Sequence, residues 1–555
     1  MYPDTRSTIH GIRIFVTFLL GPALLLLWPA SGEAATLPTL PLTFIDTTYS
    51  PPSGNTIVVN AGGNLQTAIN NAVPGDTIVL QAGATFTGPF TLPNKAGSGW
   101  IYIRSSAYAS LPPPGTRVSI ADSVFMPKIV GTAAGGDAIH TNAQAHNYRF
   151  VGIEIGPAVG QYISSLVDIG NGETSLAALP HDITFDRCYI HGDPIAGGRR
   201  GVAMNGAAVA VVDSYISDFK EVGADTQALW TYNSPGPLKI VNNYLEAAGE
   251  NFMSGGADPA ITNLVPADIE IRHNHLFKPL AWVGTTWSVK NLLEIKNGQR
   301  VLVEGNILEN NWGASQSGFS LLLTVRNQSG TAPWSAVQDI TVRLNKLINV
   351  GQGINILGRD NEAGSSLIVE RVLIENNLLL IQNINNEDHR IMQFLNAAAL
   401  SGAGPNNVTV RHNTGLILSI GAGGAGNSGM SEMFGVKADQ FDFRDNLLSN
   451  GGYGFIGTGT NAGTATLNAY YTNYTFTQNA IIGGSGTYPA NNFFPSNNAA
   501  IAFVDFAGGN YALTSASSLH NAASDGTDIG ANIAQITAAI SGVSSLVAPR
   551  NLRVQ

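Results

Sequence analysis

The sequence predicts a right-handed parallel β-helix, and three observations support this fold class. A short phrase recurs along the chain, in which β-forming residues and a polar residue precede Asn and an apolar pair, as in VLVEGNIL at 301–308, VLIENNLL at 372–379 and FDFRDNLL at 441–448. Each copy alternates apolar and polar residues, which is the period of a half-buried strand rather than of a helix. The copies follow one another at spacings of 31 to 39 residues. Such a repeat is typical of stacked coils that bury their apolar faces against one another.

Aligning the copies places one Asn of every coil in a single column. The column contains Asn243, Asn274, Asn306, Asn345, Asn377, Asn413, Asn446 and Asn479, and it is extended upstream by Ser214 and Cys188. Each Asn follows a strand, so we expect it at a bend, where it tolerates the left-handed backbone and its amide can bond the Asn of the next coil. We therefore predict a structural asparagine ladder in roughly ten to twelve coils that rise by about 4.8 Å each.

Composition and the N-terminus bound the class of protein. The chain has 555 residues, one Cys and a net charge of −10. The single Cys excludes an internal disulfide, and the negative charge argues against nucleic acid as a partner. Residues 1–34 resemble a secretory signal peptide, because Arg6 and Arg13 precede an apolar run at 14–28 and a small-residue cleavage pattern. We expect a secreted, periplasmic or extracellular monomer without a transmembrane anchor after signal removal; an uncleaved anchor is the alternative.

The segment after the signal predicts a cap on the first coil. Residues 35–55 are rich in Pro and Thr and are expected to form an extended linker. Asn64 is a good N-cap, and apolar residues at helical spacing follow it until Pro74 and Gly75, which predicts a short amphipathic α-helix. This helix precedes the strand TIVL at 77–80 and would cover the open end of the β-helix, whose edge otherwise favours aggregation.

The order of these features resembles a known superfamily. The amphipathic cap, PGDTIVL, AGATFTG and the Asn-spaced coils are similar to secreted right-handed β-helices of the pectin-lyase-like superfamily, over residues 56–535. Within that range, DGTDIGAN at 525–532 resembles a segment that closes such helices in bacterial proteins. The tail at 536–555 contains APRNLRVQ, which resembles the first strand of a fibronectin-type module. The superfamily includes lyases, hydrolases and non-catalytic adhesins, so the resemblance implies the fold without implying one function.

Two strands that follow Asn bends carry charged residues at outward positions. In LLEIKNG (292–298) and LLLTVRNQ (321–328), inward Ile295 and Val325 place Glu294, Lys296, Thr324 and Arg326 on one outer face. Lys296 and Arg326 are then neighbours on adjacent coils. A nearby cation disfavours the charged ammonium, so Lys296 can act as a base while Arg326 holds a carboxylate. This pair fits β-elimination from a uronic-acid polymer; the alternative is a solvated Glu294–Lys296 ion pair beside an ordinary surface arginine.

Lys296 and Arg326 also resemble, in kind and order, the Lys base and the Arg on the next coil in chondroitinase B and the alginate lyases grouped with it. That resemblance implies a catalytic role for both residues and a calcium ion bound by an Asn and two Glu. The present chain departs from the pattern, because Glu294 is its only acid near Lys296. A calcium site would need Asn251 or Glu250, together with Asp258, in addition to Glu294, since calcium takes six to eight oxygen ligands.

Further polar and aromatic residues surround this face. We expect Asp225, Gln227, Trp230, Thr324 and Asn327 to bind substrate, with Trp230 either a platform for a sugar ring or buried against the preceding coil. Four tryptophans lie in the two longest coils, whose extra length must form loops beside the face: Trp282, Trp287, Trp312 and Trp334.

The sequence thus favours a secreted lyase of acidic polysaccharide. Two alternatives stay open. One is a non-catalytic cell-surface or matrix protein that binds glycan. The other is a glycoside hydrolase in which Glu250 and Asp258 act as acid and base.

Overall fold

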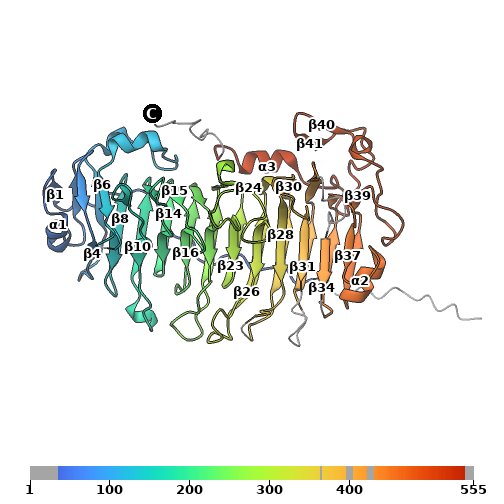
Figure 1. Ribbon diagram of the computed structural model, residues 1–555, viewed down its shortest axis with the longest axis horizontal. Helices are drawn as coiled ribbons and strands as arrows, with labels where there is room; N and C mark the ends of the chain where they lie inside the picture. Colours follow the sequence, from blue (N-terminus) through green and yellow to red (C-terminus); the bar gives the residue numbers. More distant parts are fainter. Residues whose placement is uncertain are drawn as a thin grey trace, which may run out of the picture.

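The computed structural model describes residues 35–134, 136–362, 365–395, 404–421, 431–434 and 436–543 (Figure 1). Three long sheets run the length of the molecule, and neighbouring strands within each are parallel. Successive strands of the chain enter the three sheets in turn, so each coil adds one strand to each sheet. The chain is therefore a right-handed parallel β-helix, as the sequence predicts. The signal peptide expected at 1–34 lies outside the described residues.

The sheets contain 14, 13 and 12 strands and are called sheets A, B and C. The strands of sheet A are β1 (Thr56–Val59), β2 (Thr77–Leu80), β5 (Ile101–Ser105), β8 (His146–Val151), β11 (His181–Asp186), β14 (Ala207–Val212), β17 (Leu238–Val241), β20 (Ala267–Arg272), β23 (Gly298–Glu304), β26 (Val337–Arg343), β29 (Glu370–Glu375), β32 (Asn406–Arg411), β35 (Phe441–Arg444) and β38 (Tyr474–Thr477). Those of sheet B are β3 (Thr85–Thr87), β6 (Lys128–Gly131), β9 (Glu154–Pro157), β12 (Tyr189–His191), β15 (Tyr215–Phe219), β18 (Tyr244–Ala247), β21 (His275–Phe277), β24 (Ile307–Asn311), β27 (Lys346–Val350), β30 (Leu378–Ile381), β33 (Thr414–Ile417), β36 (Leu447–Ser449) and β39 (Ala480–Ile482). Those of sheet C are β4 (Phe90–Leu92), β7 (Ile139–Thr141), β10 (Ser165–Ile169), β13 (Arg200–Met204), β16 (Gln227–Thr231), β19 (Glu250–Ser254), β22 (Leu293–Ile295), β25 (Phe319–Thr324), β28 (Gln352–Leu357), β31 (Met392–Leu395), β34 (Ser431–Phe434) and β37 (Phe455–Gly457).

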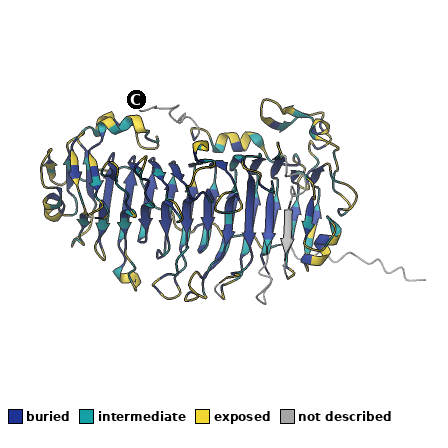
Figure 2. Cartoon of the chain, viewed as in Figure 1, coloured by how far each residue is buried: buried dark blue, intermediate teal, exposed yellow. Residues whose placement is uncertain are grey.

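The core consists of rows of apolar side chains stacked along the axis. In sheet A, for example, Val301, Ile340, Val372, Val408 and Phe441 lie opposite one another in successive strands, and each is at most 2% exposed. Figure 2 shows that the strands are buried along most of the length, whereas exposed residues gather in the end elements and loops. Each coil therefore depends on its neighbours for burial, which accounts for the repeat in the sequence.

The predicted asparagine ladder is present. The main-chain N–H and the side-chain amide of Asn306 both donate to Oδ1 of Asn345, each at 2.9 Å, and Asn345 donates in the same way to Asn377 at 3.0 Å. The pattern continues through the fully buried Asn413, Asn446 and Asn479. Upstream, the hydroxyl of Ser214 accepts from the N–H of Cys188 at 2.9 Å, so these two residues extend the ladder as predicted.

One detail of the bends differs from expectation. The left-handed residue is the one before each ladder Asn, as at Leu344 (φ 58°), Asn376 (φ 53°) and His412 (φ 52°). A bulky residue such as Leu344 rarely adopts this conformation, which costs on the order of 1 kcal/mol or more. The main-chain and side-chain hydrogen bonds of the ladder Asn hold the bend in place and offset that cost.

The N-terminal cap also forms. The helix α1 (Leu65–Asn71) begins after Asn64, whose side chain accepts from the N–H of Thr67 at 2.9 Å. Leu65, Ala68 and Ile69 of this helix are buried against the core. An additional strand, β1, precedes the helix and pairs with β2, so α1 lies between the first two strands of sheet A rather than before all of them.

The predicted linker 35–55 is a strap bound to the outside of the β-helix. The N–H groups of Thr36, Thr39 and Leu42 donate to Asn407, Asp339 and Asp268, respectively, at 2.9, 3.0 and 2.9 Å. These three acceptors lie near the starts of β32, β26 and β20. The segment therefore runs along the axis and crosses successive coils.

The coils end earlier than expected. The last strand of the three sheets is β39, whereas the sequence predicted coils up to residue 535. The helix α2 (Thr464–Tyr470) lies between β37 and β38, and the chain beyond β39 forms an antiparallel pair, β40 (Phe503–Asp505) and β41 (Asn510–Leu513), and then α3 (Ile533–Ala539). Apolar residues of this segment pack on the outside of sheet B. The fibronectin-like tail lies outside the described residues from 544 onward.

A search for membrane-spanning helices finds none of sufficient length and apolar character within the described part of the chain.

The ladder predicts a large effect of a small change. Asn345→Ala should lower the free energy of unfolding by about 3 kcal/mol, because the main-chain N–H of the buried Asn306 loses its acceptor and the carbonyls of Val303 and Arg343 lose the amide of Asn345 as a donor. The measurement is denaturant or thermal unfolding followed by circular dichroism. The exposed Asn60→Ala is the matched control. Equal stability of the two variants would contradict a structural ladder.

Candidate active site

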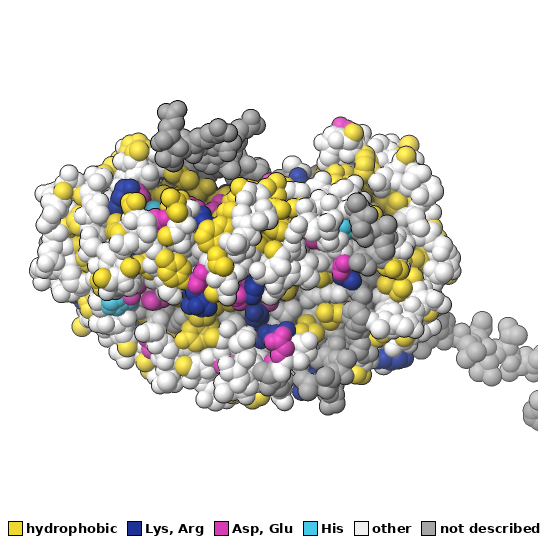
Figure 3. All heavy atoms as spheres, viewed as in Figure 1, with side chains coloured by type: hydrophobic (Ala, Val, Ile, Leu, Met, Phe, Trp, Pro, Cys, Tyr) yellow, Lys and Arg dark blue, Asp and Glu magenta, His cyan; other side chains and the backbone are white. Residues whose placement is uncertain are grey.

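The sequence-predicted site lies on the outer side of sheet C, at the middle of the molecule. Polar side chains from β16, β19, β22 and β25 and their adjoining turns meet there, and we call them the sheet C cluster: Asp225, Gln227, Glu250, Lys290, Asn291, Glu294, Lys296 and Thr324. The register of three neighbouring strands brings these side chains together. Gln227 of β16 lies opposite Glu250 of β19, and Glu294 of β22 lies opposite Met253 of β19. On the face seen in Figure 3, acidic and basic side chains lie beside one another rather than in patches of one sign.

Glu294 is held rigidly at the centre of the cluster. Its neighbour Ile295 is buried in the core, which turns Glu294 and Lys296 outward. The hydroxyl of Thr324 donates to Oε1 of Glu294 at 2.9 Å, and the amide of Asn291 donates to Oε2 at 3.2 Å. Nζ of Lys296 lies 3.7 Å from the same Oε2, and the side chain of Lys296 is 12% exposed. Lys296 thus has one rather long contact with a fixed carboxylate and access to solvent.

Arg326 lies on the next coil, and its main-chain N–H donates to the carbonyl of Lys296 at 3.0 Å. This hydrogen bond agrees with the prediction that Lys296 and Arg326 lie on neighbouring coils. The guanidinium, however, extends toward the turn after β28. There Nη1 contacts Oδ1 of Asp360 at 2.9 Å and Oδ1 of Asn361, and Nη2 lies 3.1 Å from Oε1 of Glu362. The charge of Arg326 is therefore balanced by acids of the following coil.

Glu250 is the most unusual acid of the cluster. It is fully buried, the amide of Gln227 donates to its Oε2 at 2.8 Å, and among the described residues no donor reaches its Oε1. Burial raises its pKa to about 7, and the nearby Glu294 and Asp225 contribute in the same direction. Glu250 is consequently protonated in part at neutral pH.

Lys290 joins the cluster from the loop before β22. Its ammonium forms an ion pair with Asp225, whose side chain is 33% exposed. Burial on its own would lower the pKa of Lys290, but the bond to Asp225 and the charge of Glu250 raise it overall. Lys290 therefore stays a cation and screens the two acids from each other.

Trp230 is not an open platform. It is 8% exposed, the guanidinium carbon of Arg200 lies 4.0 Å from its ring centroid, and the ring of Tyr232 stacks on it at 4.9 Å. Arg200 lies opposite Gln227 in the neighbouring strand. The sequence analysis missed Arg200, although the adjacent pair Arg199 and Arg200 at the start of a strand was a signal that could have been used.

Three predicted residues serve other contacts. Asn251 faces the interior, where its amide donates to the carbonyl of Phe277 at 2.9 Å and its Oδ1 accepts from the buried Lys278. Asp258 accepts from the N–H groups of Ser329 and Thr331 at 3.0 and 2.9 Å. Asn327 is 2% exposed and donates through its side chain to the carbonyl of Ser365.

Two of the three residues predicted to bind calcium have other hydrogen-bond partners: Asn251 accepts from Lys278, and Asp258 accepts from the loop that contains Ser329. Among the described residues, no group of three acidic, His or Cys side chains is suited to a metal ion.

The four tryptophans of the two longest coils contact other parts of the protein. The ring centroids of Trp282 and Trp287 lie 5.4 and 5.7 Å from Nζ of Lys220, and Trp312 packs with Trp282. The indole of Trp334 donates to the carbonyl of Leu264 at 3.2 Å.

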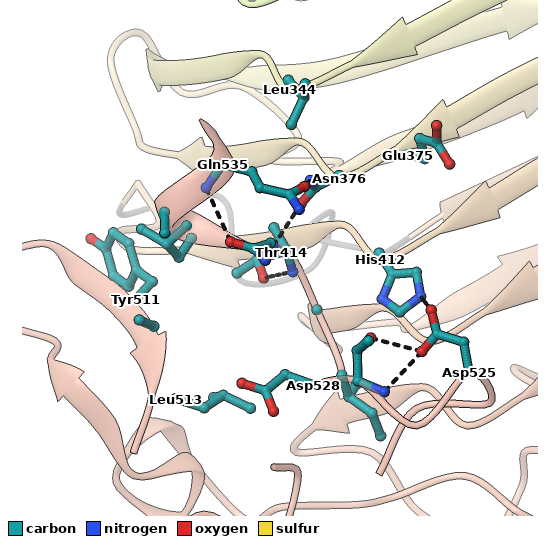
Figure 4. A pocket seen from close by; sticks show the side chains of 18 of the residues that line it. Leu344, Glu375, Asn376, His412, Thr414, Tyr511, Leu513, Asp525, Asp528 and Gln535 are labelled. Carbon is teal, nitrogen blue, oxygen red and sulfur yellow. Dashed lines mark hydrogen bonds and ion pairs between the residues drawn. The ribbon is translucent and has the colours of Figure 1, made fainter. Parts of the chain in front are cut away.

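A separate cavity of about 730 Å³ lies where the C-terminal segment crosses the ends of sheet A strands (Figure 4). His412 of the β-helix points toward Asp525 of the C-terminal segment, with 3.2 Å between Nε2 and Oδ2, and His520 contacts Asp528 at 2.7 Å. The main chain and hydroxyl of Ser524 both donate to Asp445. These contacts attach the C-terminal segment, and the cavity contains none of the residues of the sheet C cluster.

The fold and the cluster together define a β-helix protein with a charged site on one outer sheet. No family model matches the chain, and no curated protein matches it.

Several solved structures are similar at low identity. The PL6 family alginate lyase AlyGC aligns over 80% of this chain and 52% of its own length, with 13% identity and a TM-score of 0.39, so the chain spans about half of that lyase. A PL6 family polysaccharide lyase from Pseudopedobacter saltans aligns over 80% of this chain and 92% of its own, with 11% identity and a TM-score of 0.39. The pectate lyase Pel9A aligns over 88% and 97%, with 12% identity and a TM-score of 0.27. Identities this low carry no information on substrate or activity.

Glu250 predicts a pH-dependent stability. A carboxyl whose pKa rises from 4.5 to about 7 on folding destabilises the folded state as pH rises through that range, and the full cost is present above pH 7. The difference corresponds to roughly 3 kcal/mol as an upper value. Glu250→Gln should therefore be more stable than the wild type at pH 8 and similar to it at pH 4.5, as measured by urea unfolding. Glu309→Gln on sheet B is the control, and a gain that does not depend on pH would contradict the assignment.

Proposed function

We propose that this protein cleaves an acidic, uronic-acid polysaccharide by β-elimination on the outer face of sheet C. One observation supports the proposal above the others. Lys296 and Arg326 emerge at the same end of neighbouring coils, joined by a main-chain hydrogen bond of 3.0 Å, and their side chains are 12% and 15% exposed beside a mostly buried cluster. A base and a guanidinium at this spacing suit a sugar ring whose carboxylate is next to the proton to be removed.

The reaction needs two complementary groups. Arg326 pairs with the carboxylate of the uronate and thereby acidifies the adjacent C5 proton, because the negative charge that develops on the carboxylate is stabilised. Neutral Lys296 takes that proton, the C4–oxygen bond breaks, and a double bond forms between C4 and C5. Water delivers a proton to the leaving oxygen. Glu250 is fully buried and therefore acts through its neighbours rather than on the sugar.

Glu294 positions the base in this scheme. It is fixed by Thr324 and Asn291, and its carboxylate holds the ammonium form of Lys296 between turnovers.

A non-catalytic glycan-binding protein is the second candidate. The observation that favours it is the balance of charge, since Lys290, Lys296 and Arg326 each have an acidic partner. The hydrolase alternative has less support, because Glu250 is buried beside Gln227 whereas Asp258 serves a loop that contains Ser329.

Lys296→Ala tests the proposed base. Incubation of the full chain with alginate, glucuronan, pectate and chondroitin, with and without a chelator, should release unsaturated uronate from one polymer, detected by its ultraviolet absorbance. The variant should lose that activity by about 10²- to 10⁴-fold, the usual contribution of a general base. Lys346→Ala on sheet B is the matched control. New reducing ends without unsaturation would indicate a hydrolase, and binding without either product would indicate the binding protein.

Arg326→Lys tests the carboxylate contact. Lysine keeps the charge but loses the planar fork of donors, so kcat/KM should fall by about 10²-fold while folding is retained. Initial rates on the polymer identified above measure the change, and circular dichroism checks the fold. Full activity of Arg326→Lys would show that the guanidinium is not in contact with the substrate.

A further inference from the structure

The acids that contact Arg326 differ sharply in exposure. Asp360 is fully buried, whereas the side chain of Glu362 is 65% exposed. They also contact different nitrogens, since Asp360 accepts from Nη1 and Glu362 lies against Nη2. Nη1 of Arg326 is therefore held by the buried Asp360, whereas Nη2 contacts Glu362, which is exposed to solvent.

Asp360 is built into the turn after β28. Its Oδ2 accepts from the N–H of Asn327 at 2.7 Å, its Oδ1 accepts from the N–H of Glu362 at 2.9 Å, and its own N–H donates to Ser366 at 3.0 Å. This network aims Arg326 in one direction irrespective of what covers Nη2. Asp360 is thus a positioning residue for the guanidinium.

We propose that Glu362 competes with substrate, because its carboxylate occupies the place on Arg326 that the carboxylate of a uronate residue takes when substrate binds. The inference rests on the proposed function. Binding exchanges one carboxylate for another on Nη2, so the charge of Arg326 stays balanced throughout. A neutral sugar has no carboxylate to place on Nη2 and therefore leaves Glu362 in contact with Arg326.

The size of the effect follows from the exposure of Glu362. A solvated ion pair contributes little stability, so a substrate carboxylate held in a desolvated site can replace it. Removal of the competing charge should tighten binding by about two- to fivefold for an oligouronate. A neutral sugar does not compete for Nη2, so its binding should change little, and the preference for the uronate should increase.

The test measures binding in the absence of turnover. Isothermal titration with an oligouronate and with its carboxyl-reduced, neutral counterpart is carried out on full-length Lys296→Ala and on the double variant that also contains Glu362→Gln. The double variant should bind the oligouronate about two- to fivefold more tightly, should bind the neutral counterpart as before, and should therefore discriminate more strongly between the two ligands. Glu309→Gln in the same background removes an equal charge on sheet B, where Glu309 contacts His275, and should change neither value.

Each other outcome has a definite meaning. Equal or weaker oligouronate binding by the double variant, with binding lost in Lys296→Ala/Arg326→Ala, overturns the role of Glu362 and leaves the carboxylate contact of Arg326 intact. Absence of oligouronate binding in all variants overturns the proposed function and this inference together.

Discussion

The stacking of one coil on the next is the constraint on which the rest of the structure depends. Parallel strands hold successive coils in register, and the Asn column repeats that constraint at each bend through side chains such as Asn306, Asn345 and Asn377. Where paired strands stay in register, a residue that faces outward in one coil lies about 4.8 Å from its counterpart in the next. Side chains separated by thirty residues, such as Glu294 and Thr324, can therefore bond directly.

The fold could be predicted from the sequence because its cause is local and repeated. Alternation identifies strands, the Asn column identifies bends, and the run after Asn64 identifies the capping helix. The sequence favours the ladder Asn as the left-handed residue, whereas the structure places this conformation at the residue before it. Polar residues occur at both positions. The bulky Leu344 adopts the left-handed conformation despite its low propensity for it. The strap at 35–55 has no pattern of its own, since its N–H groups bond to side chains far away in the sequence.

The sequence predicted which residues of the site face outward, but it did not predict which partners they contact. Alternation placed Glu294, Lys296, Thr324 and Arg326 outward, but the partners of each side chain depend on turns of unequal length. Asp360 and Glu362 come from such a turn, and so the direction of the Arg326 side chain was not evident. The sequence suggests that Asn251 and Asp258 assist Glu294, but it does not reveal that Asp258 bonds to the loop containing Ser329 or that Asn251 bonds to the buried Lys278.

Charge balance explains how so many ionisable groups can lie on a nearly buried face. Lys290 pairs with Asp225 and Lys296 with Glu294, so the cost of desolvating each charge is partly offset by its partner. Glu250 has no cation in direct contact among these residues and instead takes up a proton, as its raised pKa indicates. Ionisation of Glu250 above neutral pH places its negative charge beside those of Glu294 and Asp225, which lowers the stability of the folded state. Acids with a strongly perturbed pKa are concentrated at functional sites. The coils from which Lys296 and Arg326 emerge thus combine two ion pairs with a buried acid of raised pKa, and this combination is the physical reason to propose the chemistry there rather than at the cavity beside His412.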